Sequence, residues 1–378
     1  MAAGRSDHST SGGRVTLKEV ARLAGVSRST TSRVLNDHPS VRPEVRARVQ
    51  EVMEDVGYVP DGIARSLRRG HTGMLGLLIP QPASTVFGDA YFATLVSAVV
   101  DAAQRAGCTV ATVLTDDPLA GRPDTTERLA AKLSADGLLD GVVATASVDD
   151  DPVPGALLDA GLPVVVIGEP SDASTTSVDV DNLAGGRLAV EHLVELGRAR
   201  VAVLAGPEGN PSARRRLEGA RRAVEAAAVT LVGVEAADHF GVEDGRRAMD
   251  RMLAAGTRPD ALVAGSDAIA VGAMAALDAH GLRVPDDVAV AGFDDLAPAR
   301  VSTPPLTTVA QPVASVGRLA VHRLLDLVGT EATGPARDAR GSADGRVVPV
   351  TGSGVDGHEG RRTVLDVALV VRGSTVPD

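Results

Sequence analysis

The first sixty residues place apolar side chains with a helical period that is broken by a glycine. Positions i, i+3, i+4 and i+7 of the first segment are apolar: Leu17, Val20, Ala21 and Ala24. Thr16 and Glu19 have the spacing of a capping box, so a first helix is predicted to start at Thr16. Gly25 supplies a turn, and Ser27 can cap a second helix.

The predicted second helix is rich in short or fork-shaped hydrogen-bonding side chains. They are Arg28, Ser29, Thr30, Ser32, Arg33 and Asn36. Such side chains suit a helix that reads base edges. A third helix opens at Pro43, and its apolar residues are spaced to close a small core: Val45, Val49, Val52, Met53 and Val56. The pattern predicts a helix-turn-helix DNA-binding domain; the alternative is an ordinary helical bundle with a solvated polar face.

After residue 70 the pattern changes to short apolar runs that alternate with amphipathic stretches. The runs predict buried parallel strands over 74–80, 109–114, 141–146, 163–168, 200–205, 261–265 and 288–292, with a final strand at 367–371. Helices are predicted between them, over 92–107, 185–197 and 212–227 among others. The pattern is that of an α/β fold with doubly wound parallel sheets. So many units exceed one domain, which favours two similar lobes with a cleft between them.

Charge is distributed unevenly along the chain of 378 residues, whose net charge is -11. Residues 1–70 hold 12 Lys and Arg against 8 Asp and Glu, whereas the remainder holds 26 against 41. An acidic body would be repelled by a phosphate backbone, which leaves contact with DNA to the basic head.

Cysteine content and hydropathy point to the cytoplasm. Cys108 is the one cysteine, which excludes an internal disulfide and fits a small buried hydrophobe. No export signal is recognisable, and no apolar run reaches the ~18 residues of a membrane span. The sequence also lacks common catalytic and nucleotide-binding motifs, and its eight His are scattered without ligand spacing. We therefore predict neither catalytic nor metal residues, no cofactor, and no enzyme activity.

The predicted organisation has four parts. A disordered tail covers 1–13, the helix-turn-helix domain 14–60, and a hinge helix or linker 61–72. The effector-binding and dimerisation body covers 73–378. Within it, one lobe comprises about 73–178 with 309–330, and the other about 179–308 with 363–378. Residues 331–362 are rich in Gly, Arg and Asp, lack periodicity, and are predicted to be a flexible insertion.

Taken together, the motifs resemble those of the lactose-repressor (LacI/GalR) family of bacterial transcription regulators from Val15 to Thr375. The carrying motifs are TLKEVARLAGVSRSTTSRVLN from Thr16, GYVPDGIARSL from Gly57, DVDNLAGG from Asp179, EHLVELG from Glu191, RLEG from Arg216, GFDD from Gly292, PLTT from Pro305 and VRGS from Val371. The resemblance implies that the head reads an operator half-site and that a hinge helix enters the minor groove. It also implies that two lobes close on a small effector, often a sugar or a nucleobase.

The resemblance also implies which residues contact DNA. Arg28, Ser29, Arg33 and Asn36 would face the major groove or its phosphates, with Thr16, Ser27, Thr30, Ser32 and Tyr58 as further contacts. Arg28 and Ser29 are expected to set sequence specificity, an Arg there favouring guanine; the alternative is that Arg28 only holds a phosphate. In the hinge, Ala64 lies in the matching helix, and Leu67 matches the residue that wedges between base pairs.

Three positions depart from the family pattern. Thr31 stands where an apolar residue is usual, Arg42 where a Ser or Thr cap is usual, and Asp61 with Gly62 replaces the common hinge start. Gly62 costs up to ~1 kcal/mol of helix propensity, so weak or partner-dependent DNA binding is one expectation.

Carried over by position, the effector site contains Arg216, which would hold a polar group of the ligand, and Asp294, which would accept from ligand hydroxyls or amines. Phe240 matches a stacking aromatic. The remaining candidates are Tyr91, Asn210, Ser212, Ser266 and Asp267. Solvated or core positions are the alternatives for several of them. Few aromatics in the cleft favour a sugar over a purine.

The resulting hypothesis is a cytoplasmic homodimeric repressor that binds a pseudo-palindromic operator and is controlled by a small ligand. A transport protein that binds sugars has a similar two-lobed body, but it would need an export signal and no helix-turn-helix head. An enzyme would turn over its cleft ligand. The sequence does not decide whether the effector releases the DNA or tightens its binding.

Overall fold

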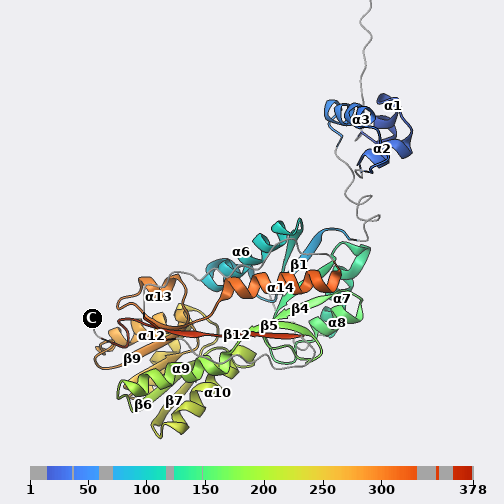
Figure 1. Cartoon of the computed structure of the whole chain (residues 1–378). Helices are drawn as coiled ribbons and strands as arrows, with labels where there is room; N and C mark the ends of the chain where they lie inside the picture. Colours follow the sequence, from blue (N-terminus) through green and yellow to red (C-terminus); the bar gives the residue numbers. More distant parts are fainter. Residues whose placement is uncertain are drawn as a thin grey trace, which may run out of the picture. The chain divides into compact units, whose positions relative to one another are not determined.

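The computed structural model describes residues 15–35, 38–58, 71–115, 123–146, 148–329, 346–348 and 361–376. The chain divides into two compact units, Met1–Thr72 and Gly73–Asp378, which we call the head and the body (Figure 1). None of the described helices has the length and apolar character that crossing a membrane requires.

The described residues of the head form three helices, α1 (Leu17–Leu23), α2 (Arg28–Leu35) and α3 (Pro43–Asp55). Its small core contains the buried side chains of Val20, Ala24, Val34 and Val49. Other valines of α3 pack partly buried around them. The three predicted helices are confirmed, including the start of α3 at Pro43.

The predicted caps of the head have different outcomes. Ser27 Oγ accepts a hydrogen bond from the Thr30 amide at 3.0 Å, which confirms the cap of α2. Thr16 is the N-cap residue of α1, but its side chain makes no capping hydrogen bond, so the capping box is not formed. Glu19 lies instead 3.9 Å from Arg22, one turn further along α1.

Thr31, the polar residue at an expected apolar position, is completely buried in this core. Its hydroxyl donates to the Ser27 carbonyl at 3.2 Å, one turn back along α2. The hydroxyl is thus satisfied within its own helix, which explains how the core tolerates it.

In the body, the first lobe contains a sheet of six parallel strands in the order β12-β5-β4-β3-β1-β2. The strands are β1 (Met74–Ile79), β2 (Thr109–Leu114), β3 (Gly141–Thr145), β4 (Val164–Ile167), β5 (Thr176–Val180) and β12 (Arg362–Leu365). Its helices are α5 (Ala83–Gly88), α6 (Ala90–Arg105), α7 (Pro123–Ser134), α8 (Val153–Asp159), the short η1 (Ala135–Gly137) and α14 (Val313–Val328). Cys108 is buried in the core of this lobe, as predicted.

The second lobe contains a sheet of seven strands in the order β11-β13-β10-β9-β8-β6-β7. The strands are β6 (Arg200–Ala205), β7 (Thr230–Ala236), β8 (Ala261–Ala264), β9 (Ala289–Asp294), β10 (Thr307–Ala310), β11 (Arg346–Val348) and β13 (Ala368–Val371). Its helices are α9 (Asn182–Glu195), α10 (Pro211–Ala226), α11 (Val242–Ala254), α12 (Asp267–Ala279) and α13 (Ala297–Val301). β13 runs antiparallel to β10 and β11, and the other pairs are parallel. Two doubly wound lobes are thus confirmed.

Three of the described connections pass between the lobes: β5 to α9, β10 to α14, and β12 to β13. The predicted second-lobe segment 363–378 is therefore wrong at its start, because β12 pairs with β5 in the first-lobe sheet. The predicted flexible insertion needs a similar correction, since residues 346–348 form β11 against β13. Its segments 331–345 and 349–360 lie outside the described residues.

Candidate functional site

The candidate site of the body lies where strands of both sheets end and helices begin. Asp294 is the last residue of β9, Asp267 is the first residue of α12, and Tyr91 lies in the first turn of α6. Arg216 lies in the second turn of α10. Tyr91, Asp267 and Asp294 all lie close enough to interact electrostatically with the Arg216 guanidinium, so four of the predicted residues are brought together from both lobes.

Arg216 is held by acceptors of the protein itself. Its Nε donates to Asn182 Oδ1 at 2.9 Å, and one Nη donates to the Gly265 carbonyl at 2.6 Å. The guanidinium carbon lies 3.6 Å from the centre of the Phe293 ring, a cation–π contact. Only 11% of the side chain is exposed. Burial lowers the pKa of Arg216, and the surrounding carboxylates oppose that shift.

Asp294 lies 3.7 Å from the same Nη of Arg216 and accepts a hydrogen bond from the Gln311 side-chain amide. Burial raises the pKa of Asp294 to about 6, although Arg216 acts in the opposite direction. Its backbone has a φ of +126°, and Asp295 follows at +57°. Such values are rare outside glycine and mark a turn that its surroundings hold in place.

Asp267 is 1% exposed and uses both carboxylate oxygens within the protein. One accepts from the Thr308 hydroxyl, and the other accepts from the Leu296 amide at 2.9 Å. Burial and the charge of Asp294 raise its pKa. Asp267 therefore fixes the loop that follows Asp294.

The first lobe contributes Tyr91 and Asp89. Asp89 Oδ1 accepts from the Tyr91 amide at 2.8 Å and caps α6. Burial, together with nearby Asp294, raises the pKa of the Tyr91 phenol, so the hydroxyl stays protonated at neutral pH and can donate. The rings of Tyr91 and Phe92 pack edge to face, with their centroids 5.3 Å apart.

A further group comes from the end of β5. Asp179 accepts from the Val180 amide at 2.8 Å and from the Asn182 side chain at 3.1 Å. Burial raises the pKa of Asp179 to about 6. Asn182 thus links Asp179 to Arg216.

Sequence reasoning did not single out Asp89, Asp179, Asn182 or Gln311. The DVDN motif held a signal for two of them, whereas Asp89 and Gln311 have none that could be recognised from one sequence.

The other predicted residues have local roles in the structure. Asn210 Oδ1 accepts from the Ala213 amide at 3.0 Å and caps α10, and Ser266 Oγ accepts from the Ile269 amide at 3.1 Å and caps α12. Ser212 is half-buried in the first turn of α10. Phe240 lies so close to Gly206 that a Cβ there would be 2.3 Å from a ring carbon.

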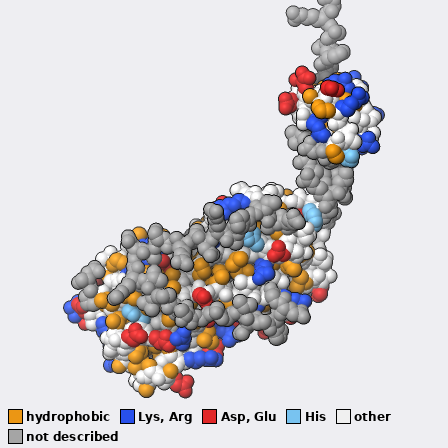
Figure 2. All heavy atoms as spheres, viewed as in Figure 1, with side chains coloured by type: hydrophobic (Ala, Val, Ile, Leu, Met, Phe, Trp, Pro, Cys, Tyr) orange, Lys and Arg blue, Asp and Glu red, His pale blue; other side chains and the backbone are white. Residues whose placement is uncertain are grey.

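Of the eight predicted DNA contacts that the structure describes, five are exposed to solvent. Thr16, Ser27, Arg28, Ser29 and Arg33 are exposed. Thr30 and Ser32 are half-buried, and Tyr58 packs partly buried against the core. Ser27 Oγ lies within hydrogen-bonding distance of the hydroxyls of Ser29, at 2.7 Å, and Thr30, at 2.8 Å. Figure 2 shows Lys and Arg side chains over the visible surface of the head. Asn36, Ala64 and Leu67 lie outside the described residues.

Two family models match the chain. Residues 16–61 match the model described as bacterial regulatory proteins, lacI family, and residues 190–347 match a periplasmic binding protein-like domain. Among curated proteins, the transcriptional regulator CelR of Thermobifida fusca is 36% identical over 332 residues, which cover 86% of this chain and 95% of CelR. The ribose operon repressor of Escherichia coli is 34% identical over 82% of this chain and 92% of its own length.

Solved structures give the same result. A complex of the regulator CelR with cellobiose has a TM-score of 0.68 at 32% identity, covering 96% of this chain and 100% of CelR. A lac repressor dimer bound to operator and an anti-inducer has a TM-score of 0.80 at 27% identity, covering 96% of this chain and 99% of the repressor. The likeness includes both the head and the body.

Proposed function

This chain belongs to the lacI family of bacterial regulatory proteins, and from this membership we propose that it is a transcriptional repressor whose operator affinity is controlled by a small ligand. One observation gives the strongest support to the proposed effector site. Tyr91 of the first lobe shares a buried electrostatic environment with Arg216 and Asp294 of the second. A ligand that contacts these residues from both sides would stabilise one relative position of the lobes.

DNA recognition is assigned to α2. Arg28 and Ser29 are exposed at its first turn, where side chains of a recognition helix meet base edges. Arg28 is proposed to pair with a guanine. The alternative is that Arg28 contacts a phosphate, and the two possibilities predict different effects of replacing it. Replacing Arg28 with Ala would relax sequence preference at one base pair in the first case and weaken binding to all sequences in the second.

The charges of the site favour a neutral, hydroxyl-rich ligand. Asp89, Asp179, Asp267 and Asp294 lie around Arg216, whose Nε and one Nη already donate to protein acceptors, and Arg362 adds a second cation 3.9 Å from Asp179. An anionic ligand would bring a further negative charge against these carboxylates, which costs several kcal/mol at a partly desolvated site. A sugar supplies hydroxyl donors to the carboxylates. A sugar effector agrees with the CelR–cellobiose complex among the similar structures.

We propose that two copies act together in the cytoplasm. A homodimer would place two heads on the half-sites of a pseudo-palindromic operator, and the hinge helices, including Ala64 and Leu67, would enter the minor groove between them. Closure of the lobes would then alter the spacing of the hinges. A ligand that weakens DNA binding must itself bind the DNA complex less well, by the same factor.

Selection of binding sites from a randomised duplex pool tests this proposal. The purified protein is used at physiological salt, alone and with cellobiose, ribose or glucose 6-phosphate. We expect enrichment of a two-fold symmetric site that a neutral sugar removes or sharpens, while the phosphorylated sugar has no effect. Absence of enrichment in every condition would overturn the repressor function, and a response to the phosphorylated sugar alone would overturn the ligand class.

Two variants test the body and the hinge separately. Asp294→Asn should abolish the sugar response while leaving operator selection in place, because only the body is altered. Leu67→Ala should reduce specific operator binding and leave the dimer intact; unchanged operator affinity would refute the wedge assignment of Leu67.

A further inference from the structure

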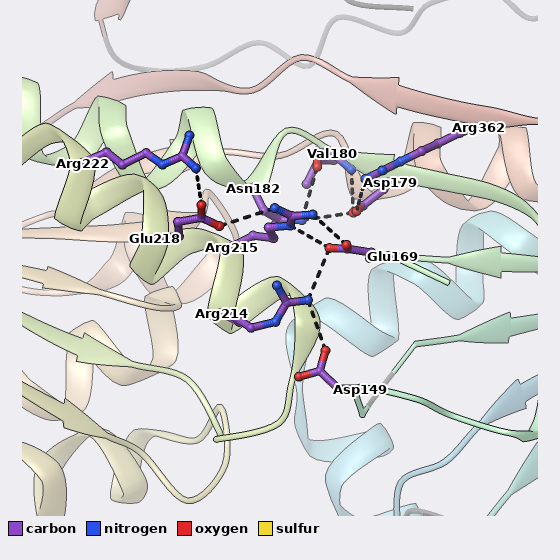
Figure 3. A network of polar contacts seen from close by, with 10 residues as sticks. All are labelled: Asp149, Glu169, Asp179, Val180, Asn182, Arg214, Arg215, Glu218, Arg222 and Arg362. Atoms are coloured by element: carbon purple, nitrogen blue, oxygen red, sulfur yellow. Dashed lines mark hydrogen bonds and ion pairs between the residues drawn. The ribbon is translucent and has the colours of Figure 1, made fainter. Parts of the chain in front are cut away.

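Charged side chains meet across the boundary between the two lobes, beside the helix that carries Arg216. Arg214 and Arg215 lie near the start of α10 in the second lobe. Asp149 follows β3, and Glu169 follows β4, both strands of the first-lobe sheet. Figure 3 shows the two arginines pointing toward these two carboxylates.

Arg215 and Glu169 form a two-point contact. Arg215 Nε donates to Glu169 Oε2 and Nη2 donates to Oε1, both at 2.8 Å. The side chain of Glu169 is 21% exposed and that of Arg215 is 35% exposed. Hydrogen bonding from Arg215 lowers the pKa of Glu169, so the carboxylate is charged at neutral pH. Bidentate Arg–carboxylate pairs are stronger and more specific in geometry than single contacts.

Arg214 adds two contacts beside this pair. Its Nη2 lies 3.2 Å from Asp149 Oδ1 and 3.7 Å from Glu169 Oε2. The Asp149 amide also donates to the Gly209 carbonyl of the second lobe at 2.6 Å. Side chains and backbone thus connect the lobes at one place, and these contacts must break if the lobes separate there.

Neighbouring charged residues do not substitute for the Arg215–Glu169 contact between the lobes. Glu218 lies 3.4 Å from Arg215, but it belongs to α10 itself and is also bound by Arg222. Arg362 lies 3.9 Å from Asp179 and its charge also acts on Glu169, but it belongs to the same lobe as Glu169. Arg215 therefore has a partner within its own helix, but its two-point partner is in the other lobe.

We propose that Arg214, Arg215, Asp149 and Glu169 form an interlobe clasp that positions α10, and with it Arg216, against the first lobe. Arg216 is the next residue after Arg215 in α10, so fixing this turn of the helix to the first lobe fixes the approach of Arg216 to Tyr91. The clasp makes the relative position of the lobes sensitive to ionic strength. Its effect on ligand affinity rests on the proposed function of the site, whereas its effect on lobe position does not.

The clasp is tested by measuring the distance between spin labels on the two lobes of the full chain. Cysteines replace the exposed Leu138 of the first lobe and Leu196 of the second in a Cys108→Ala background. Labelled protein is mixed with excess unlabelled protein, so that measured pairs lie within one chain. The Debye length falls from about 10 Å at 0.1 M salt to about 3 Å at 1 M. Raising NaCl between these values should broaden the distance distribution or shift its maximum.

Variants decide whether the named residues cause this effect. Asp149→Asn with Glu169→Gln should give the broad distribution at both salt concentrations. Arg246→Gln is the matched control, because Arg246 pairs with Glu243 and Asp250, which belong to its own helix α11. A wild-type distribution in the double neutral variant, or one insensitive to salt in the wild type, would overturn the clasp.

Cellobiose titration of the same proteins connects the clasp to the site. The neutral variant should bind about 3- to 10-fold more weakly than the Arg246→Gln control, as expected for the loss of partly buried ion pairs. Equal affinity would refute the positioning role. If no sugar in the panel binds even the wild type, the proposed ligand class fails, and the distance measurement still decides the clasp.

Discussion

Replacing Gly186 with Ala should destabilise the body and disturb Arg216. α9 and α10 cross so closely that a Cβ on Gly186 would lie 2.0 Å from the Arg216 carbonyl oxygen and 3.1 Å from the Ala220 amide. On the opposite helix, a Cβ on Gly219 would lie 2.0 Å from the Leu183 carbonyl oxygen. Both neighbours are backbone atoms, so no side chain can rotate away to make room.

The expected magnitude follows from this distance. An ordinary contact of a Cβ is at least 3.4 Å, so the two helices would have to move apart by more than an ångström. Overpacking of a tight interior typically costs 1–3 kcal/mol, occasionally more, and Ala regains up to about 1 kcal/mol of helix propensity over Gly. We expect the free energy of unfolding to fall by roughly 2 kcal/mol or more. Sugar affinity should fall as well, because the displaced backbone carries Arg216.

Urea unfolding of the full chain, followed by circular dichroism, measures this change. Gly155→Ala is the matched control: Gly155 also lies in a helix, α8, and a Cβ added there would meet no neighbouring heavy atom within 4 Å. That variant should be as stable as the wild type or more stable by up to about 1 kcal/mol. Equal midpoints for Gly186→Ala and the wild type would refute the close approach of α9 and α10.

Three further predictions concern the head, the pH response and a buried ion pair. Ser27→Ala removes the cap of α2 and should lower the stability of the head by about 1 kcal/mol, measured by its thermal melting; an unchanged melting temperature would contradict the role of the cap. Burial raises the pKa of Asp179 from 3.8 to about 6, so the folded state binds the proton more tightly. The stabilisation that this proton contributes is fully present below pH 3.8 and is lost as the pH rises through 6. The resulting fall in the free energy of unfolding is at most roughly 3 kcal/mol. When urea unfolding is measured over a series of pH values, Asp179→Asn should reduce the change in midpoint across this range. Arg372→Gln leaves Asp295, whose side chain is 9% exposed, with the exposed Arg300 as its ion-pair partner among the described residues and should cost about 2–4 kcal/mol in urea unfolding, whereas Arg246→Gln should leave the urea midpoint nearly unchanged.

Most of the strands that the sequence predicted have side chains that are almost all apolar and buried, such as β1, β3 and β4, although β2 was predicted and is partly exposed. Two central strands escaped prediction because they carry buried polar residues. β5 contains Ser177 and Asp179, and β10 begins with Thr307 and Thr308. The Thr308 hydroxyl donates to Asp267, and the Thr307 hydroxyl donates to the Arg372 carbonyl. Partners so distant in sequence stabilise the polar side chains of β10, and no local pattern reveals them. In β5, Asp179 accepts from the nearby Val180 and Asn182, and Ser177 Oγ has no hydrogen-bond partner among the described residues.

The candidate site likewise has a part that could be predicted from the sequence and a part that could not. Arg216 and Asp294 could be proposed because each stands in a recognisable motif. What the motifs could not give is how these two side chains are held. Asn182 comes from α9, Gly265 follows β8, and Gln311 follows β10. These elements meet only in the folded second lobe.

The way in which Arg216 is held limits what it can contribute to ligand selection. Its Nε and one Nη donate to protein acceptors, and its face lies on Phe293. Asp294 is fixed in turn by Gln311 and by a backbone turn of positive φ. The second-lobe half of the proposed site is thus held by contacts within the protein itself, and pre-organised groups cost little to align on binding. The first-lobe half of the site is variable. The distance of Tyr91 and Asp89 from Arg216 and Asp294 depends on how far the lobes close. Discrimination between ligands should therefore depend on closure, so that clasp variants change the order of affinities among sugars, whereas Asp294→Asn abolishes the response to all of them.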